Sequence, residues 1–328
     1  MKIFVTRKVP GKALSKLATS GNEVNIALQG RPLTDQELLD GVVGVDAILS
    51  LLTDKIDGDV MDAAGPQLKV ISNYAVGFDN INVKDATDRG IVVTNTPSDA
   101  VNEAVAELTW TLILGLTRRV VEADEATRRG AYKGWEPDIF LGHSLTGKTL
   151  GIIGLGRIGT MVAKRALGFG VKVAYNKRTP DPEIEKELGI KFATMDELLT
   201  ASDIISLHVP LTEETRGLVN KEMLAKTKPG AFLINTARGP IVREDDLVES
   251  LRNGHLGGVA LDVYENEPNI HPELIGMENV ILTPHIASAT IEAREDMCEL
   301  AVSGLLSSLS GTCPANIVNK EVWEKRRK

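Results

Sequence analysis

Three closely spaced glycines are the first residues in this sequence that could support specific chemistry. Gly154, Gly156 and Gly159 lie in "TLGIIGLGRIGT", after an apolar run and before a helical pattern. In a strand, turn and helix unit, the first glycine permits the tight turn and the second lets the backbone approach a pyrophosphate. The third lets the helix pack on the strand, and N–H groups at the helix start face the phosphates. The stretch predicts a dinucleotide site that includes Arg157 and Ile158.

The end of the next apolar run indicates which dinucleotide is preferred. An acidic residue at this position commonly holds the ribose hydroxyls of NAD. Here "VKVAYN" ends instead in Asn176, followed by Lys177 and Arg178. Without a carboxylate there is no repulsion against a 2′-phosphate, and two cations can pair with it. The sequence therefore favours NADP, and NAD is the alternative if these residues form only a solvated basic turn.

Two of the five histidines lie where nicotinamide chemistry would need a proton donor. Such chemistry requires a group that polarises the reacting carbonyl and a donor that works near neutral pH. His208 and His285 each close an apolar run, in "DIISLHVP" and "NVILTPH". Both are therefore expected at the edge of a parallel sheet where ligands bind. Position does not separate the two, and a structural hydrogen bond at a strand end is the alternative for each.

An arginine and two glutamates follow other apolar runs in the same way. Arg238 lies in "INTARGPIV", and Glu265 and Glu267 lie in "DVYENEPN". A guanidinium can bind a carboxylate through two parallel hydrogen bonds. A carboxylate can orient an imidazole and favour its protonated form. The two glutamates are equal candidates on spacing, and a surface position is the alternative for Arg238.

Two series of alternating strands and helices must position these residues. The first hundred residues contain apolar runs such as "KIFVT", "VDAILS" and "LKVIS", and a second series begins at Lys148 with "TLGIIG" and "VKVAY". Runs this rich in Val, Ile and Leu are typical of parallel strands buried on both faces. The sequence predicts an α/β fold with two doubly wound parallel-sheet domains of the Rossmann-like or flavodoxin-like type, and a cleft between the two domains.

The order of these elements predicts that the first domain is discontinuous. A helical pattern runs from Asp99 to Arg129, and a closing helix follows His285. We expect residues 1–99 with 289–328 to form a substrate domain, and residues 100–288 to form the dinucleotide domain. A single helix over 99–129 would be longer than average, which is typical of a bridge between domains or a contact with a partner subunit.

Composition and charge exclude several classes of protein. The 328 residues are 43% hydrophobic and 25% charged, as in ordinary globular proteins of two domains. A net charge of −8 argues against non-specific nucleic-acid binding. No run approaches the roughly 20 apolar residues of a membrane helix, and "MKIFVTRKVP" lacks the apolar core of a signal peptide. We expect a cytoplasmic protein, and the two cysteines have no partners at metal-ligand spacing.

Seven motifs, spread over nearly the whole chain, carry a resemblance to a known family. They are "NYAVGFDNINV", "GIVVTNTP", "GKTLGIIGLGRIG", "LHVPLTEETRGLVN", "INTARGPIV", "GGVALDVYENEP" and "ILTPHIASAT". In this order they resemble the D-isomer-specific 2-hydroxyacid dehydrogenases, most closely the glyoxylate and hydroxypyruvate reductase branch. The resemblance implies reduction of a small 2-oxo acid, giving glycolate or D-glycerate, with NADPH or NADH.

The resemblance also separates the candidate catalytic residues. Arg238, Glu267 and His285 match the family's catalytic arginine, glutamate and histidine, whereas His208 and Pro210 fall in the cofactor-binding segment. Arg238 would bind the substrate carboxylate and approach the carbonyl oxygen. His285 would protonate the developing alkoxide, while Glu267 holds the imidazole and favours its charged form.

Further contacts with the substrate are implied in the first domain and in one later segment. Val76 and Gly77 match backbone donors to the substrate carboxylate. From their place at a strand end, Leu51 and Leu52 would bound the pocket near the substrate's side chain. Trp135 matches a tryptophan that reaches the pocket from the partner subunit, with a packing role as the alternative. A homodimer is therefore expected.

Cofactor contacts beyond the glycine motif are also implied. Asp262 matches a residue that contacts the nicotinamide amide, and the turn at Thr236 and Ala237 is expected beside it. Two other functions are compatible with the same motifs. One is a D-lactate or D-3-phosphoglycerate dehydrogenase, and the other is a dinucleotide-sensing binding protein of the corepressor type.

Overall fold

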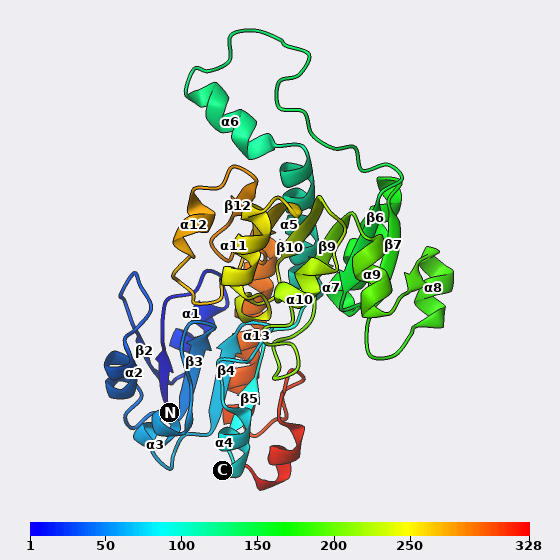
Figure 1. The fold of residues 1–328 in the computed structure, drawn as a ribbon. Helices are drawn as coiled ribbons and strands as arrows, with labels where there is room; N and C mark the ends of the chain where they lie inside the picture. The colour runs from blue at the N-terminus through cyan, green and yellow to red at the C-terminus, as the bar shows by residue number, and fades with distance from the viewer. The chain divides into compact units, whose positions relative to one another are not determined.

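The computed structural model describes all 328 residues, which divide into two compact units. One unit comprises residues 1–101 and 289–328, and the other comprises residues 102–288. Each unit is built around one sheet whose strands all pair in parallel (Figure 1). The predicted α/β fold with two doubly wound parallel sheets is confirmed.

The first unit contains a five-stranded sheet in the order β2-β1-β3-β4-β5, which is the flavodoxin-like order. Helices α1 and α13 contact each other on this sheet, whereas α3 contacts both α2 and α4. The strands are β1 (Lys2–Val5), β2 (Glu23–Ile26), β3 (Ala47–Leu51), β4 (Val70–Tyr74) and β5 (Val92–Thr94). The helices are α1 (Leu14–Thr19), α2 (Asp35–Gly41), α3 (Gly58–Ala64), α4 (Val83–Asp88), α13 (Ile291–Leu309) and the short 3₁₀ helix η2 (Lys320–Lys325).

The second unit contains a seven-stranded sheet in the order β12-β11-β10-β9-β6-β7-β8. The strand order reverses between β6 and β9, so this is where a ligand is expected at the carboxyl ends of the strands. The strands are β6 (Thr149–Ile153), β7 (Lys172–Asn176), β8 (Lys191–Phe192), β9 (Ile204–Leu207), β10 (Ala231–Asn235), β11 (Leu256–Leu261) and β12 (Val280–Leu282). The helices are α5 (Asp99–Thr117), of which residues 99–101 belong to the first unit, α6 (Val120–Arg128), α7 (Arg157–Gly168), α8 (Pro182–Leu188), α9 (Met195–Ala201), α10 (Lys221–Ala225), α11 (Glu244–Arg252), α12 (Pro272–Ile275) and the 3₁₀ helix η1 (Gly239–Ile241).

Successive residues of the central strands face two separate hydrophobic clusters, one on each side of the second sheet. Ile204 of β9 packs in the cluster formed with α5 and α7, whereas the next residue, Ile205, packs in the cluster formed with α9, α10 and α11. This alternation follows from the two-residue period of a strand. Trp110 of α5 fixes one layer, because its indole Nε1 donates to the carbonyl of Val162 in α7 at 3.0 Å. Both faces of the sheet are therefore covered.

The prediction of one continuous helix over residues 99–129 is wrong. The chain forms α5, breaks, and starts again as α6, because Arg119 adopts the left-handed region at φ 54°. The carbonyl of Thr117 leaves the helical pattern to accept from the backbone N–H of His143 at 2.8 Å. Gly142 packs against the same carbonyl, where a Cβ atom would lie only 2.5 Å from the oxygen. A contact from a distant segment thus ends α5.

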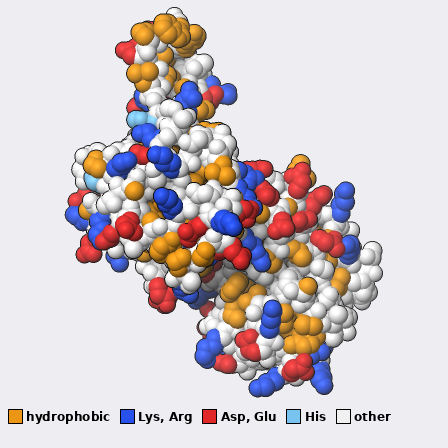
Figure 2. Space-filling view, turned by 90° about the vertical axis from the view of Figure 1, so that its right-hand side faces the viewer, with side chains coloured by type: hydrophobic (Ala, Val, Ile, Leu, Met, Phe, Trp, Pro, Cys, Tyr) orange, Lys and Arg blue, Asp and Glu red, His pale blue; other side chains and the backbone are white.

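Helix α6 and the irregular segment after it project from the second unit (Figure 1). No residue of α6 is buried. Hydrophobic side chains gather on this projection, at the top of Figure 2. We call residues 120–147 the arm. None of the helices is both long enough and apolar enough to cross a membrane.

Candidate active site

Four of the candidate residues follow neighbouring strands of the second sheet. His208 directly follows β9, Arg238 follows β10, Glu267 follows β11 and His285 follows β12. These strands pair in parallel, so their carboxyl ends lie at one edge of the sheet. The structure therefore brings the four segments to the same edge of one unit.

Glu267 and His285 form the central pair at this edge. Nδ1 of His285 lies 2.9 Å from Oε2 of Glu267, and about a third or less of each side chain is exposed. The other carboxylate oxygen of Glu267 accepts from the backbone N–H of Tyr264 at 3.1 Å. Burial alone would raise the pKa of Glu267, but the hydrogen bond and charge of His285, with this N–H and the charge of Arg238, hold it below the usual value. Glu267 is therefore an ionised acceptor.

The ionised state of Glu267 decides how His285 can act. An ionised carboxylate only accepts hydrogen bonds, so Nδ1 of His285 must be the donor in this pair. The proton that the ring can exchange with a ligand then lies on Nε2. This is the arrangement of a general acid whose ring is oriented by a carboxylate.

Asp262 fixes the backbone that carries His285. Its fully buried carboxylate accepts from the hydroxyl of Thr283 at 2.6 Å and from the N–H groups of Ile286 and Ala287, both at 2.8 Å. Its own carbonyl accepts from the N–H of His285 at 2.9 Å. His285 itself lies in the left-handed region, at φ 55°, which a non-glycine residue adopts only when its surroundings hold it there. Burial raises the pKa of Asp262.

The family resemblance implies that Asp262 contacts the nicotinamide amide, and that contact stays a prediction. The three bonds to the 283–287 segment are not predictable from the sequence, because hydrogen bonds between residues some twenty positions apart leave no spacing signal in it. They identify Asp262 as the residue that fixes the conformation of the His285 segment.

Asn235 does the same for the turn that carries Arg238. Its buried side chain donates from Nδ2 to the carbonyl of Arg238 and accepts through Oδ1 from the N–H of Ala237, both at 3.0 Å. The hydroxyl of Thr236 lies 2.9 Å from that of Thr109 on α5. Sequence reasoning missed Asn235, although its place as the last residue of a strand, in "INTAR", is a signal that could have indicated it.

The structure separates the two histidines that position alone could not. Nε2 of His208 lies 2.9 Å from the hydroxyl of Ser206, and no carboxylate contacts the ring. Burial of the ring lowers the pKa of His208 to about 4, so it is neutral near pH 7 and has no proton to donate there. Of the two, only His285 has a carboxylate partner.

The glycine loop has the geometry that a pyrophosphate requires. Gly154 adopts φ 99°, and a Cβ atom there would lie 2.6 Å from the carbonyl oxygen of His208. A Cβ atom on Gly159 would collide with the carbonyl oxygen of Gly154. Around Gly156 there is open space, and this residue begins α7 without any side-chain cap. The loop is therefore tight on the protein side and open where N–H groups face outward, which fits a dinucleotide phosphate.

The residues around this loop divide into packed and exposed ones. Ile158 packs on the core cluster of α5 and α7, whereas Arg157 is exposed. Pro210, after β9, is exposed, and its carbonyl accepts from the hydroxyl of Thr215 at 2.7 Å.

The predicted ribose-binding residues differ in whether their side chains already have a partner within the protein. Asn176 donates to the carbonyl of Ala193 at 2.9 Å. The ammonium of Lys177 lies 3.0 Å from the carboxylate of Asp181. Arg178 is exposed. The cation that faces solvent is therefore Arg178, while Lys177 already has a carboxylate partner.

The candidate substrate residues of the first unit lie at two strand ends. Leu51 and Leu52 are half-buried at the end of β3. After β4, the carbonyls of Val76 and Gly77 accept from the side chains of Asn95 and Asn73, at 2.7 and 2.9 Å. These two bonds fix the turn through the carbonyl oxygens of Val76 and Gly77. The backbone N–H groups of the same residues take no part in them. Trp135, on the arm of the second unit, is 81% exposed, so its own chain provides no packing role for it.

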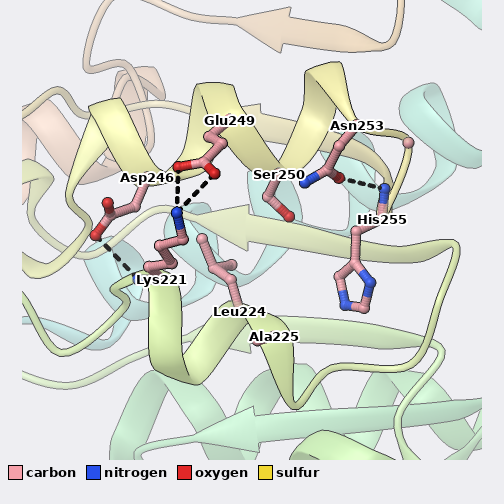
Figure 3. Close-up of a pocket in the computed structure, with 9 residues that line it drawn as sticks. Lys221, Leu224, Ala225, Asp246, Glu249, Ser250, Asn253 and His255 are labelled. Atoms are coloured by element: carbon pink, nitrogen blue, oxygen red, sulfur yellow. Dashed lines mark hydrogen bonds and ion pairs between the residues drawn. The ribbon is translucent and has the colours of Figure 1, made fainter.

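The cavity in Figure 3 lies elsewhere in the second unit. It has a volume of about 410 Å³ between α10 and α11, and its lining includes Lys221, Glu249, Ser250 and His255. Glu249 binds the ammonium of Lys221 through both oxygens, at 2.7 and 2.9 Å. None of the candidate catalytic residues lines this cavity.

Comparison with known proteins gives consistent matches. Residues 110–287 match the family described as "D-isomer specific 2-hydroxyacid dehydrogenase, NAD binding domain". The glyoxylate reductase of Thermococcus onnurineus is 45% identical over 99% of this chain and 98% of its own, and that of Thermofilum pendens is 50% identical over 99% and 96%. The crystal structure of an NADPH-dependent glyoxylate/hydroxypyruvate reductase from Sinorhizobium meliloti, in complex with NADP and malonate, covers 100% of this chain and 98% of its own. Its TM-score is 0.85 at 35% identity.

The low pKa of His208 predicts a loss of stability in mild acid. An unfolded histidine takes up its proton near pH 6.5, roughly, whereas folded His208 does so only at about 4. Between these values the unfolded chain binds more protons, so the free energy of unfolding falls as the pH falls. Going from about pH 7 to about pH 4.5, we expect the wild type to lose roughly 2 kcal/mol more than His208→Gln does in urea unfolding.

The exposed histidine of the arm supplies the control for this measurement. His143→Gln should keep the pH dependence of the wild type. Equal losses in the wild type and in His208→Gln would show that His208 does not bury a neutral ring.

Proposed function

The chain belongs to the D-isomer-specific 2-hydroxyacid dehydrogenase family, and on that premise we propose that it reduces glyoxylate and hydroxypyruvate to glycolate and D-glycerate. The cofactor is NAD or NADP. The observation that carries the proposal is the 2.9 Å contact between His285 and an ionised Glu267, in the unit that also contains the glycine loop. Curated relatives of full length that are named glyoxylate reductases support the choice of substrate.

The proposed mechanism assigns one task to each residue of the trio. When bound, the reduced nicotinamide supplies a hydride to the carbonyl carbon of the substrate. Arg238 binds the substrate carboxylate through its planar guanidinium. His285 donates the proton on Nε2 to the carbonyl oxygen, which becomes the hydroxyl of the product. Glu267 keeps the ring oriented and stabilises its charged form until the proton leaves. In the opposite direction, neutral His285 takes the hydroxyl proton.

The glycine loop and the backbone of the first unit supply binding. N–H groups around Gly156 at the start of α7 would hold the pyrophosphate, with Arg157 beside them. We propose that the backbone N–H groups of Val76 and Gly77 bind the substrate carboxylate together with the guanidinium of Arg238. Leu51 and Leu52 would bound the space beyond it.

A substrate panel tests the proposed activity directly. The purified protein should oxidise NADPH or NADH with glyoxylate and hydroxypyruvate at least about tenfold more efficiently than with pyruvate or 3-phosphohydroxypyruvate, a difference of about 1.4 kcal/mol in the barrier. His285→Ala should reduce turnover by roughly 10²- to 10⁴-fold, since it removes the general acid.

Each other outcome of the panel selects a different function. Preference for pyruvate or for the phosphorylated acid would replace the proposal by a D-lactate or D-3-phosphoglycerate dehydrogenase. Binding of dinucleotide without turnover of any of the four acids would indicate a dinucleotide-sensing binding protein.

We further propose that NADP is the preferred cofactor and that Arg178 is its main determinant. Arg178 is exposed after β7, where NAD-binding Rossmann folds commonly have an acidic residue, and Lys177 is paired with Asp181. The Sinorhizobium meliloti relative binds NADP, which supports this assignment.

Arg178→Gln should therefore lower kcat/KM with NADPH by about tenfold or more, since a hydrogen bond to a charged group contributes roughly 1.5 to 3 kcal/mol. The value with NADH should not change. Lys177→Gln should have a smaller effect, and Lys172→Gln, at the exposed start of β7, should have none. Equal losses with both cofactors would remove the preference for NADP.

We also propose that the protein is a homodimer in which the arm contacts a second copy. The arm exposes Trp135, and its other exposed apolar side chains cluster with it on the same projection: Val120, Val121, Tyr132, Ile139 and Leu141. Apolar surface of this kind on a projecting segment is typical of an interaction site. In this arrangement Trp135 reaches the partner's substrate site and limits the size of the substrate.

A mixture of two variants, each defective in a different residue of the site, tests at low glyoxylate concentration whether Trp135 acts across the subunits. Trp135→Ala should raise the KM for glyoxylate, and His285→Ala should lower turnover by roughly 10²- to 10⁴-fold. If Trp135 acts in the partner, a mixed dimer has one complete site, so reassociated mixtures should recover roughly a quarter of the wild-type sites. If Trp135 acts in its own chain, the mixed dimer has no complete site and no recovery occurs.

A further inference from the structure

Two glutamates outside the catalytic trio join the segments that carry it. The backbone N–H of Glu244 donates to Oε2 of Glu265 at 3.0 Å, and the N–H of Glu265 donates to Oε1 of Glu244 at 2.9 Å. Glu244 begins α11, six residues after Arg238, and Glu265 lies two residues before Glu267. Each glutamate therefore binds the backbone of the other through its side chain. We call this pair the carboxylate clasp.

Both bonds of the carboxylate clasp satisfy backbone N–H donors, one at the start of α11 and one in the turn that leads to Glu267. The first N–H groups of a helix have no partner within the helix. Arg243, the residue before α11, makes no capping bond with its side chain. Glu265 therefore caps α11 from another segment, as an N-cap carboxylate would do locally. In return Glu244 holds the N–H of the turn that leads to Glu267.

Glu244 is buried, so its carboxylate depends on the hydrogen bonds of the clasp. Glu244 is only 5% exposed, and its pKa is raised by burial and by the neighbouring charge of Glu265. The backbone N–H groups of Glu265 and His271, and the charge of His271, act in the opposite direction. A carboxylate buried beside another carboxylate is unfavourable unless it is well hydrogen-bonded. The bonds of the clasp supply that compensation.

The two segments are also in direct backbone contact next to the clasp. A Cβ atom on Gly239 would collide with the carbonyl of Tyr264, so the residue after Arg238 lies against the residue before Glu265. Tyr264 in turn donates its N–H to Glu267 at 3.1 Å and its hydroxyl to the carbonyl of Thr283 at 2.8 Å. A shift of the clasp would therefore move the donor that orients Glu267, and with it His285.

We propose that Glu244 and Glu265 are positioning residues that fix the Arg238 segment relative to the Glu267 and His285 pair. This inference rests on the proposed function, because it assigns to these residues a role in the same reduction. Neither residue contacts the substrate; both act through Arg238 and Glu267.

Variants that keep or remove the acceptor atoms test the proposal. Glu244→Ala and Glu265→Ala remove one bond each and should lower kcat for glyoxylate by roughly ten- to a hundredfold, since small misplacements of reacting groups cost that much. Glu244→Gln and Glu265→Gln keep an oxygen that accepts from the same N–H and should stay within about threefold of the wild type. Glu249→Ala, an exposed position on the same helix, is the control.

Three further readouts separate positioning from simple stability. The Kd for NADPH, measured by fluorescence, should stay within about threefold in all variants, because the glycine loop is untouched. The double alanine variant should lose little more than the worse single variant, since the two bonds act as one unit. If an alanine variant does not fold, Glu244→Asp and Glu265→Asp retain the charge but withdraw the acceptor, and each should lower kcat by at least about fivefold.

The outcomes distinguish this inference from the proposed function. Alanine or aspartate variants that fold and keep the wild-type kcat would overturn the inference alone, as would glutamine variants that lose as much as alanine variants. A wild type that reduces none of the acids would contradict the proposed function, and this inference with it.

Discussion

The hydrogen bond between Glu267 and His285 is the interaction on which the rest of the candidate site depends. Because the carboxylate is held ionised, it accepts from Nδ1 of the ring, and the proton that the ring can exchange with a ligand then lies on Nε2. The trio occupies one edge of the second sheet, because parallel strands present all their carboxyl ends on the same side. The fold thus places an imidazole, the carboxylate that accepts from it and a guanidinium within segments that follow adjacent strands.

Buried polar side chains behind these segments hold each of them in one conformation. Asp262 binds the segment around His285, Asn235 binds the turn before Arg238, and the carboxylate clasp joins the segments of Arg238 and Glu267. Each of these side chains satisfies backbone groups that would otherwise be costly to bury. The segments that carry the trio are therefore held by buried side chains that are not themselves members of the trio. The left-handed conformation of His285 is a direct consequence of such support.

Much of this arrangement could be predicted because it depends on local sequence. The apolar runs predict the two parallel sheets, since strands buried on both faces are nearly continuous hydrophobic stretches in the sequence. The spacing of the three glycines predicts the phosphate-binding loop, because close backbone contacts leave no room for a side chain at Gly154 and Gly159. Other features depend on residues far apart in the chain. The choice between His208 and His285 rests on burial and on a carboxylate eighteen positions away, and the break at Arg119 rests on a contact from His143. The partnership of Glu244 with Glu265 leaves no spacing pattern for the same reason.

The turnover of glyoxylate by Glu267→Gln, measured beside the wild type at one pH near 7, tests the central claim most directly. In the proposed mechanism His285 donates the proton on Nε2, and Glu267 orients the ring by accepting from Nδ1. The account predicts that kcat falls by roughly tenfold or more in Glu267→Gln, while the Kd for NADPH stays within about threefold. A wild-type kcat in Glu267→Gln would contradict the account, because the pair would then not position the general acid.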